Sequence, residues 1–161
     1  MPPTRLVADA MLGSLARKLR AFGFDTVYYK GGDDAGLLRT AKSQRRFIVT
    51  ADRGLASVAE RSGLGVLLVV GSTDGRRISS MLAGTRKKGL RLSPGDPLCS
   101  LCNGSLVQVS RADVLTGLPK SVAERHRSFH ECTNCGKLYW KGSHWKKLRR
   151  LERLFAASRP H

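Results

Sequence analysis

The first 94 residues alternate between short apolar segments and longer segments with a helical period. The apolar segments are RLVAD at 5–9, DTVYY at 25–29, FIVT at 47–50 and VLLVV at 66–70. Between and after them, apolar residues recur every three or four positions, which predicts helices over 12–22, 33–43, 52–61 and from Ser72 or Thr73 to Lys88. This alternation with short links predicts an α/β fold, a parallel sheet flanked by helices on both faces.

The pattern changes at RLSPGDPL, residues 91–98, where two prolines and a glycine interrupt the helical period. We place a domain boundary there, with one domain over 1–92 and a smaller module over 93–161. The module contains paired cysteines, a strand-like segment SLVQV at 105–109 and an irregular stretch around Gly117 and Pro119. A basic helix is predicted at its end, from about Ser143 to Ala157.

The chain is strongly basic, with 29 lysines and arginines against 12 acids and a formal charge of +17. The excess is spread over both parts, because residues 1–94 hold 17 basic and 7 acidic side chains and residues 95–161 hold 12 and 5. Such a charge favours a polyanionic partner, either nucleic acid or an anionic membrane. No apolar run is long enough to span a bilayer and the amino end lacks a signal peptide's apolar core, so we expect a cytoplasmic protein with no membrane partner.

Four cysteines form two close pairs, 29 residues apart: Cys99 with Cys102, and Cys132 with Cys135. In a chain without export signals this spacing favours a metal over disulfides, which are the alternative. Four thiolates complete the tetrahedral coordination of Zn²⁺ and leave no open position, so the predicted zinc is structural. His130 and His144 are then not needed as ligands.

Three aspartates are predicted to meet at the carboxyl edge of the sheet. Asp9 ends the first strand, Asp52 follows the third, and Asp33 and Asp34 open the second helix. In open α/β sheets the ligand crevice lies at this edge. Each acid taken singly is explained as a helix cap or a solvated loop residue. Together, Asp9, Asp34 and Asp52 favour a Mg²⁺ or Mn²⁺ site, whose chemistry suits phosphodiester hydrolysis.

Several motifs in order carry a family resemblance. They are Asp9-Ala-Met-Leu-Gly, LARKLRAFGFDT at 15–26, Asp33-Asp34, the Thr50-x-Asp52 turn, CSLCNG at 99–104 and CTNCGKLYWKGSHW at 132–145. Together they resemble the Mut-seven C-terminal ribonuclease family, whose members carry a PIN-like nuclease domain followed by a zinc ribbon.

The resemblance implies metal-dependent RNA cleavage, with Asp9, Asp34 and Asp52 as the catalytic acids and Asp33 as a helix cap. Asp74, which follows the fourth strand, is a further candidate because PIN domains often use a fourth acid. The family's turn usually reads Thr-Arg-Asp, whereas this chain has Ala51, which removes a phosphate contact.

A basic and aromatic segment follows the second cysteine pair. Aromatic rings can stack on unpaired bases while cations hold phosphates, so we predict RNA contacts from Trp140, Trp145, Lys141, Lys146, Lys147, Arg149 and Arg150. The alternative is that both tryptophans pack on the ribbon while Leu148, Leu151, Leu154 and Phe155 dock the helix. Arg17 and Arg20, expected on the exposed side of the first helix, are either further phosphate contacts or part of a solvated face.

The sequence therefore predicts a metal-dependent ribonuclease that holds RNA partly through its basic zinc ribbon. A non-catalytic RNA-binding or ribosome-associated zinc-ribbon protein, in which the acids are helix caps, is the chief alternative. Association with the ribosome or with tRNA is a further partner hypothesis. A nuclease acting on DNA would keep the same site, and the choice of RNA depends on the family resemblance.

Overall fold

Four short parallel strands form the central sheet of the protein. The computed structural model describes residues 4–157, and the strands β1 (Leu6–Ala8), β2 (Thr26–Tyr28), β3 (Phe47–Thr50) and β4 (Val66–Leu68) pair in the order β2-β1-β3-β4. Each neighbouring pair is parallel. The predicted parallel sheet is confirmed, and β3 has the predicted bounds.

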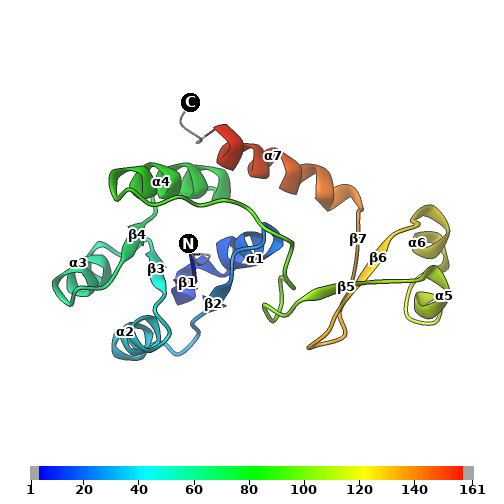
Figure 1. Ribbon diagram of the computed structural model, residues 1–161, viewed down its shortest axis with the longest axis horizontal. Coiled ribbons are helices and arrows are strands. Elements are labelled where there is room, and N and C mark those ends of the chain that lie inside the picture. The colour runs from blue at the N-terminus through cyan, green and yellow to red at the C-terminus, as the bar shows by residue number, and fades with distance from the viewer. Residues whose placement is uncertain (1–3, 158–161) are drawn as a thin grey trace.

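Helices cover both faces of this sheet (Figure 1). Successive strand residues point to opposite faces, so Leu6 and Ala8 enter one core and Val7 enters the other. The helices that cover the first core are α1 (Gly13–Ala21), α4 (Asp74–Lys87) and α7 (Ser143–Ala157). The second core lies under α2 (Asp34–Ser43) and α3 (Arg53–Arg61).

Polar side chains begin the helices where the sequence predicts. The carboxylate of Asp33 accepts the Gly36 N–H at 2.9 Å, and that of Asp52 accepts the Leu55 N–H at 2.9 Å. Of the two candidates for α4, Thr73 is the cap, with its hydroxyl accepting from the next turn. These bonds satisfy backbone donors that have no partner inside the helix.

The last helix, α7, returns from the cysteine module and packs on the sheet domain beside α4 (Figure 1). Phe155 is 2% exposed, and its ring centroid lies 5.5 Å from that of Phe22 and 5.2 Å from that of Phe24. Leu148, Leu151 and Leu154 pack against the same core, which confirms the docking interpretation for these residues. The two parts of the chain therefore share one core. The domain boundary after residue 92 stays a prediction from the sequence pattern.

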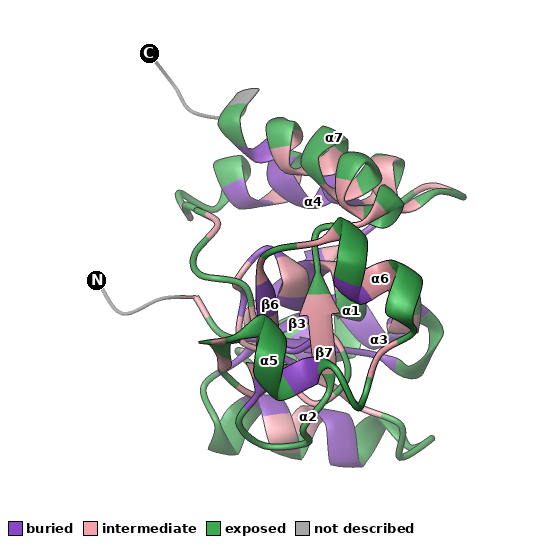
Figure 2. Ribbon diagram, turned by 90° about the vertical axis from the view of Figure 1, so that its right-hand side faces the viewer, coloured by how far each residue is buried: buried purple, intermediate pink, exposed green. Residues whose placement is uncertain are grey.

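The cysteine module is built on an antiparallel sheet of β5 (Leu106–Val109), β6 (Phe129–Cys132) and β7 (Leu138–Trp140). Between β5 and β6 the chain forms two short helices, α5 (Arg111–Val114) and α6 (Lys120–Arg125), where the sequence predicted an irregular stretch. Ser110 and Asp113 begin α5 with a reciprocal capping box. This helix start was not predicted, because a helix of four residues is too short to show a helical period of apolar residues. Both helices are mostly exposed (Figure 2).

Arg20 is buried, and the expectation that it lies on the exposed side of the first helix was wrong. Only 6% of the residue is exposed. Its Nε donates to the Thr26 carbonyl at 2.7 Å, and a terminal nitrogen donates to the carbonyls of Ser100 and Leu101 at 3.0 Å each. The first cysteine pair folds over this part of α1, a contact between distant segments that helical periodicity cannot reveal.

A second set of hydrogen bonds around Asp25 joins the cysteine module to the sheet edge. The side chain of Asn103, which lies just after Cys102, donates to the Asp25 carboxylate at 2.7 Å and accepts the Thr26 N–H at 3.0 Å. The nearly buried guanidinium of Arg46 donates to the same carboxylate at 2.8 Å. Asp25 thus fixes the cysteine module against β2.

Across residues 4–157, no helix combines the length and the apolar composition that crossing a bilayer requires.

The Asp25 network predicts a specific acid sensitivity. Burial raises the pKa of Asp25, but hydrogen bonds from Arg46, Asn103 and Arg5 outweigh this and hold the pKa below its ordinary value. A carboxyl with a lowered folded-state pKa stabilises the fold above its unfolded pKa, and this contribution is lost as pH falls through the folded value.

We therefore expect the unfolding free energy of the parent to fall more steeply than that of Asp25→Asn as pH drops below the ordinary aspartate range. Denaturant titrations at a series of pH values measure this difference. Protonation of the cysteine thiolates would affect both proteins alike, so the difference between their slopes isolates Asp25. Parallel slopes would contradict the assignment.

Candidate active site and cysteine metal site

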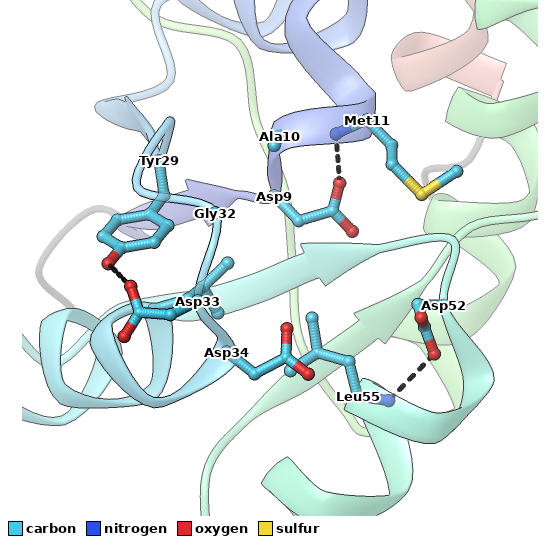
Figure 3. Close-up of a pocket in the computed structure, with 10 residues that line it drawn as sticks. Asp9, Ala10, Met11, Tyr29, Gly32, Asp33, Asp34, Asp52 and Leu55 are labelled. Carbon is cyan, nitrogen blue, oxygen red and sulfur yellow. Dashed lines mark hydrogen bonds between the residues drawn. The ribbon is translucent and has the colours of Figure 1, made fainter.

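A pocket of about 110 Å³ lies at the carboxyl edge of the parallel sheet (Figure 3). Asp9 enters it from the end of β1, Asp34 from the start of α2 and Asp52 from the start of α3. A water molecule occupies about 30 Å³ of liquid, so the pocket has room for a phosphoryl group or a partly hydrated cation. The structure brings the three predicted acids into one pocket, and their role as ligands stays a prediction.

Asp9 is held in place by hydrogen bonds at both carboxylate oxygens. The residue is 6% exposed; Oδ1 accepts the Met11 N–H at 2.9 Å and Oδ2 accepts the hydroxyl of Thr50. The same hydroxyl oxygen accepts the Asp52 N–H at 3.0 Å. Thr50 therefore connects Asp9 to the backbone of Asp52.

Asp33 and Asp34 divide two roles between them. Asp33 accepts a hydrogen bond from the Tyr29 hydroxyl at 2.7 Å and caps α2 by accepting the Gly36 N–H. These two hydrogen bonds hold the pKa of Asp33 below its usual range, and the bond from Tyr29 has the larger effect. Asp34 is exposed, and its carboxylate has no hydrogen bond or ion pair within the described part of the chain. Asp34 is therefore available to a ligand.

The pocket acids stand apart from one another. Within residues 4–157, the four cysteines form the one group of three or more metal-ligating residues whose ligand atoms all lie within 4.8 Å of each other. Mg²⁺ commonly keeps several waters and takes only one or two protein carboxylates together with substrate phosphate. Asp9, Asp34 and Asp52 therefore do not form a ready-made ligand cluster of this kind in the described part of the chain.

Asp74 lies outside this pocket. It accepts hydrogen bonds from Lys18 at 2.6 Å and Ser14 at 2.8 Å, and Arg77 lies 3.5 Å away. Burial raises the pKa of Asp74, but the bonds from Lys18 and Ser14 outweigh it and leave the pKa lowered. Its carboxylate is already neutralised by protein cations, so we do not include it in the site.

Three residues of the site were missed as functional positions by sequence reasoning. The Thr50 hydroxyl joins two acids, although the sequence showed it only as part of a turn motif. Tyr29 and Met11 line the pocket; Tyr29 is the last residue of a predicted strand, and Met11, although part of the Asp9-Ala-Met-Leu-Gly motif, had no role assigned to it.

The four cysteines converge on one point, as predicted. The Sγ atoms of Cys99 and Cys135 are 3.6 Å apart, and those of Cys102 and Cys132 are 3.4 Å apart. Thiolates around tetrahedral zinc lie about 3.8 Å apart, from the Zn–S length of about 2.3 Å. A disulfide needs sulfurs about 2 Å apart, so all four cysteines are free.

Neighbouring groups support this metal site. Hydrogen bonding, led by the Asn134 side chain, lowers the pKa of Cys102 to about 6, which favours the thiolate form that binds metal. At Cys135 a backbone hydrogen bond from Lys137 lowers the pKa, but desolvation and the other three thiols outweigh it and raise the pKa to about 12. Gly104 is required because a Cβ there would lie 2.9 Å from the sulfur of Cys132. The set is compatible with structural zinc, and neither His130 nor His144 belongs to it.

Most of the predicted RNA-contact residues are accessible. Arg17 is exposed on α1; Lys146, Lys147, Arg149 and Arg150 are exposed on α7. Trp140 is 37% exposed, and Lys141 lies over the half-buried Trp145 ring at 5.3 Å from its centroid. Arg20 is the exception, because its guanidinium is bonded to backbone carbonyls.

Comparison with known proteins gives one match. The model of the Mut7-C RNAse domain family matches residues 4–152, nearly the whole chain. The chain belongs to the Mut7-C RNAse domain family. Searches among curated proteins and among solved structures found no match. Membership of this family indicates a nuclease-like hydrolase with RNA as its substrate or partner.

The cysteine geometry predicts that the Mut7-C chain carries tightly bound zinc. We expect one zinc ion per purified chain by inductively coupled plasma mass spectrometry. Cys135→Ser should lose most of this metal, while the matched control His144→Ala should keep it, because four thiolates complete the coordination. Retention of zinc by Cys135→Ser, or its loss from His144→Ala, would contradict this ligand set.

Proposed function

We propose that this protein is a metal-dependent ribonuclease that hydrolyses RNA phosphodiester bonds in the cytoplasm. Asp9, Asp34 and Asp52 would hold Mg²⁺ or Mn²⁺, while the four cysteines hold a structural zinc. The observation that supports this most strongly is the gathering of the three acids in one pocket of a +17 chain from a nuclease family.

The carboxylate oxygens fit such a cation, since hard oxygen ligands suit Mg²⁺ and Mn²⁺. Asp9 would offer a fixed ligand because Thr50 and the Met11 N–H hold its carboxylate, and Asp34 would offer a free one. When bound, the cation would lower the pKa of a water and neutralise charge on the phosphoryl oxygens. Ala51, which packs against the first core, leaves this turn without the cation that the family usually carries beside its acid.

The basic face of α7, formed by Lys146, Lys147, Arg149 and Arg150, would contribute much of the affinity for RNA. Because α7 packs on α4 and on the first core, its exposed lysines and arginines are held in a fixed position relative to the sheet. Their charges attract phosphates, and the accessible ring of Trp140 can stack on an unpaired base. The exposed basic residues of α7 would therefore bind RNA at a fixed position relative to the sheet domain.

A non-catalytic RNA-binding protein is the second candidate, favoured by a specific observation. Asp33 and Asp52 cap α2 and α3, and Asp9 caps the short 3-10 helix η1 (Ala10–Leu12). These bonds alone would explain three of the pocket acids. Under this hypothesis the protein binds RNA and does not cut it in Mg²⁺ or Mn²⁺.

Four single substitutions separate the two candidates. We expect Asp9→Asn, Asp34→Asn and Asp52→Asn each to lower RNA cleavage in Mn²⁺ by about a hundredfold or more, because each removes a charged oxygen ligand. The matched control Asp33→Asn should retain near-parental cleavage, since asparagine also caps helices well.

Cleavage of a labelled RNA is measured with and without EDTA, alongside thermal unfolding to establish that each variant is folded. Asp52→Asn preserves its cap for the same reason as the control. Parental activity in all three variants would show that the proposed site is wrong. Binding without cleavage by the parent protein would favour the second candidate.

A further inference from the structure

Met11 places an apolar side chain on the wall of the acidic pocket. The residue is 72% exposed, more than any other large apolar residue in the described part of the chain. An isolated exposed apolar residue needs no explanation on an ordinary surface. Met11, however, lines the pocket together with four aspartates.

The backbone of Met11 is tied to the acid that the proposed function uses. Its N–H donates to Asp9 Oδ1 at 2.9 Å within the turn that η1 forms. Figure 3 shows its side chain extending from this turn toward the side of the pocket that Asp52 occupies. A group that Met11 contacts would therefore lie beside the carboxylates.

Tyr29 forms the opposite wall of the pocket and is held there by neighbouring groups. Figure 3 shows Tyr29 on the far side of the acids from Met11, with its hydroxyl bonded to Asp33. A Cβ added at Gly31 or Gly36 would collide with this hydroxyl. Tyr29 therefore occupies the space that a side chain at either of these positions would need. The pocket thus has acids between two side chains that offer apolar surface.

Such an arrangement fits a nucleotide better than a phosphate alone. The apolar surface of Met11 contributes little to the core because most of it remains in water. A nucleobase presents a flat, polarisable face, and the methionine thioether makes favourable contacts with aromatic rings. In a duplex that face is stacked on its neighbours, whereas in unpaired RNA it is open to side chains.

We propose that Met11 contacts the nucleobase beside the scissile phosphate, and that the substrate class is RNA with unpaired bases at the cleavage site. This inference rests on the proposed ribonuclease function. Met11 would act as a positioning residue: its contact with the base would place the phosphate over Asp9, Asp34 and Asp52 and add little to the overall affinity for RNA.

Substitutions of Met11 combined with altered substrates test the contact. We expect Met11→Ala to lower kcat/KM on single-stranded RNA by about five- to tenfold, the upper part of the range for a contact between a methionine thioether and an aromatic ring. Met11→Leu keeps the apolar surface and should retain most activity. The matched control Val58→Ala, which shortens an exposed apolar residue on α3 outside the pocket, should match the parent.

An abasic nucleotide is then moved through the same RNA, position by position. At the position facing Met11, the missing base should remove the difference between the parent and Met11→Ala. Binding of uncut RNA in EDTA should be nearly equal for the two proteins, because the basic surface carries most of the affinity.

The outcomes distinguish this inference from the proposed function. Equal cleavage by the parent and Met11→Ala, or a difference that persists at every abasic position, would overturn the base contact and leave the ribonuclease in place. Equal cleavage of duplex and single-stranded RNA would overturn the substrate class. No cleavage by the parent in Mn²⁺ would overturn both proposals together.

Discussion

The parallel pairing of β1 with β3 is the constraint on which the candidate active site depends. Ala8 lies opposite Val49, and the next N–H, that of Asp9, donates to the Val49 carbonyl at 3.1 Å. This register brings Asp9 beside Thr50, whose hydroxyl then bonds both to its carboxylate and to the N–H of Asp52. A shift of one residue would turn every side chain of the strand to the other face and separate these groups.

A second constraint holds the cysteine module to the sheet domain. Arg20 and Asp25 form hydrogen bonds with the segment around the first cysteine pair. At the other end of the module, Phe155 packs into the core of the sheet domain beside Phe22. The module is therefore attached at both ends. Metal binding at the cysteines would stabilise these contacts, because a small module gains much of its folding free energy from its metal. The basic face of α7 would depend on the same attachment for its position.

Much of this architecture could be predicted from local signals in the sequence. The four strands were visible as short apolar runs and the helix starts as capping residues such as Asp33 and Thr73. The shared edge of a parallel sheet then placed Asp9, Asp34 and Asp52 together. Two cysteine pairs were sufficient to predict their cluster.

What escaped prediction depends on contacts between segments far apart in sequence. Arg20 has the spacing of an exposed helix residue, and only the folded position of Ser100 and Leu101 buries it. The helix α5 is too short for its period to be recognised. The exposure of Met11 could not be foreseen, because the residue lies between the first predicted strand and the first predicted helix, where periodicity assigns no face.

The proposed ribonuclease requires that the pocket formed by Asp9, Asp34 and Asp52 bind a divalent cation. Crystals grown with Mn²⁺ test this directly, because an anomalous difference map locates manganese without reference to activity. We expect a manganese peak in the pocket, coordinated by Asp34 and at least one of the other two acids, with waters completing the shell. A fully occupied peak at Asp74 or Asp33 with none at Asp34, or a pocket without manganese at millimolar concentration, would contradict it.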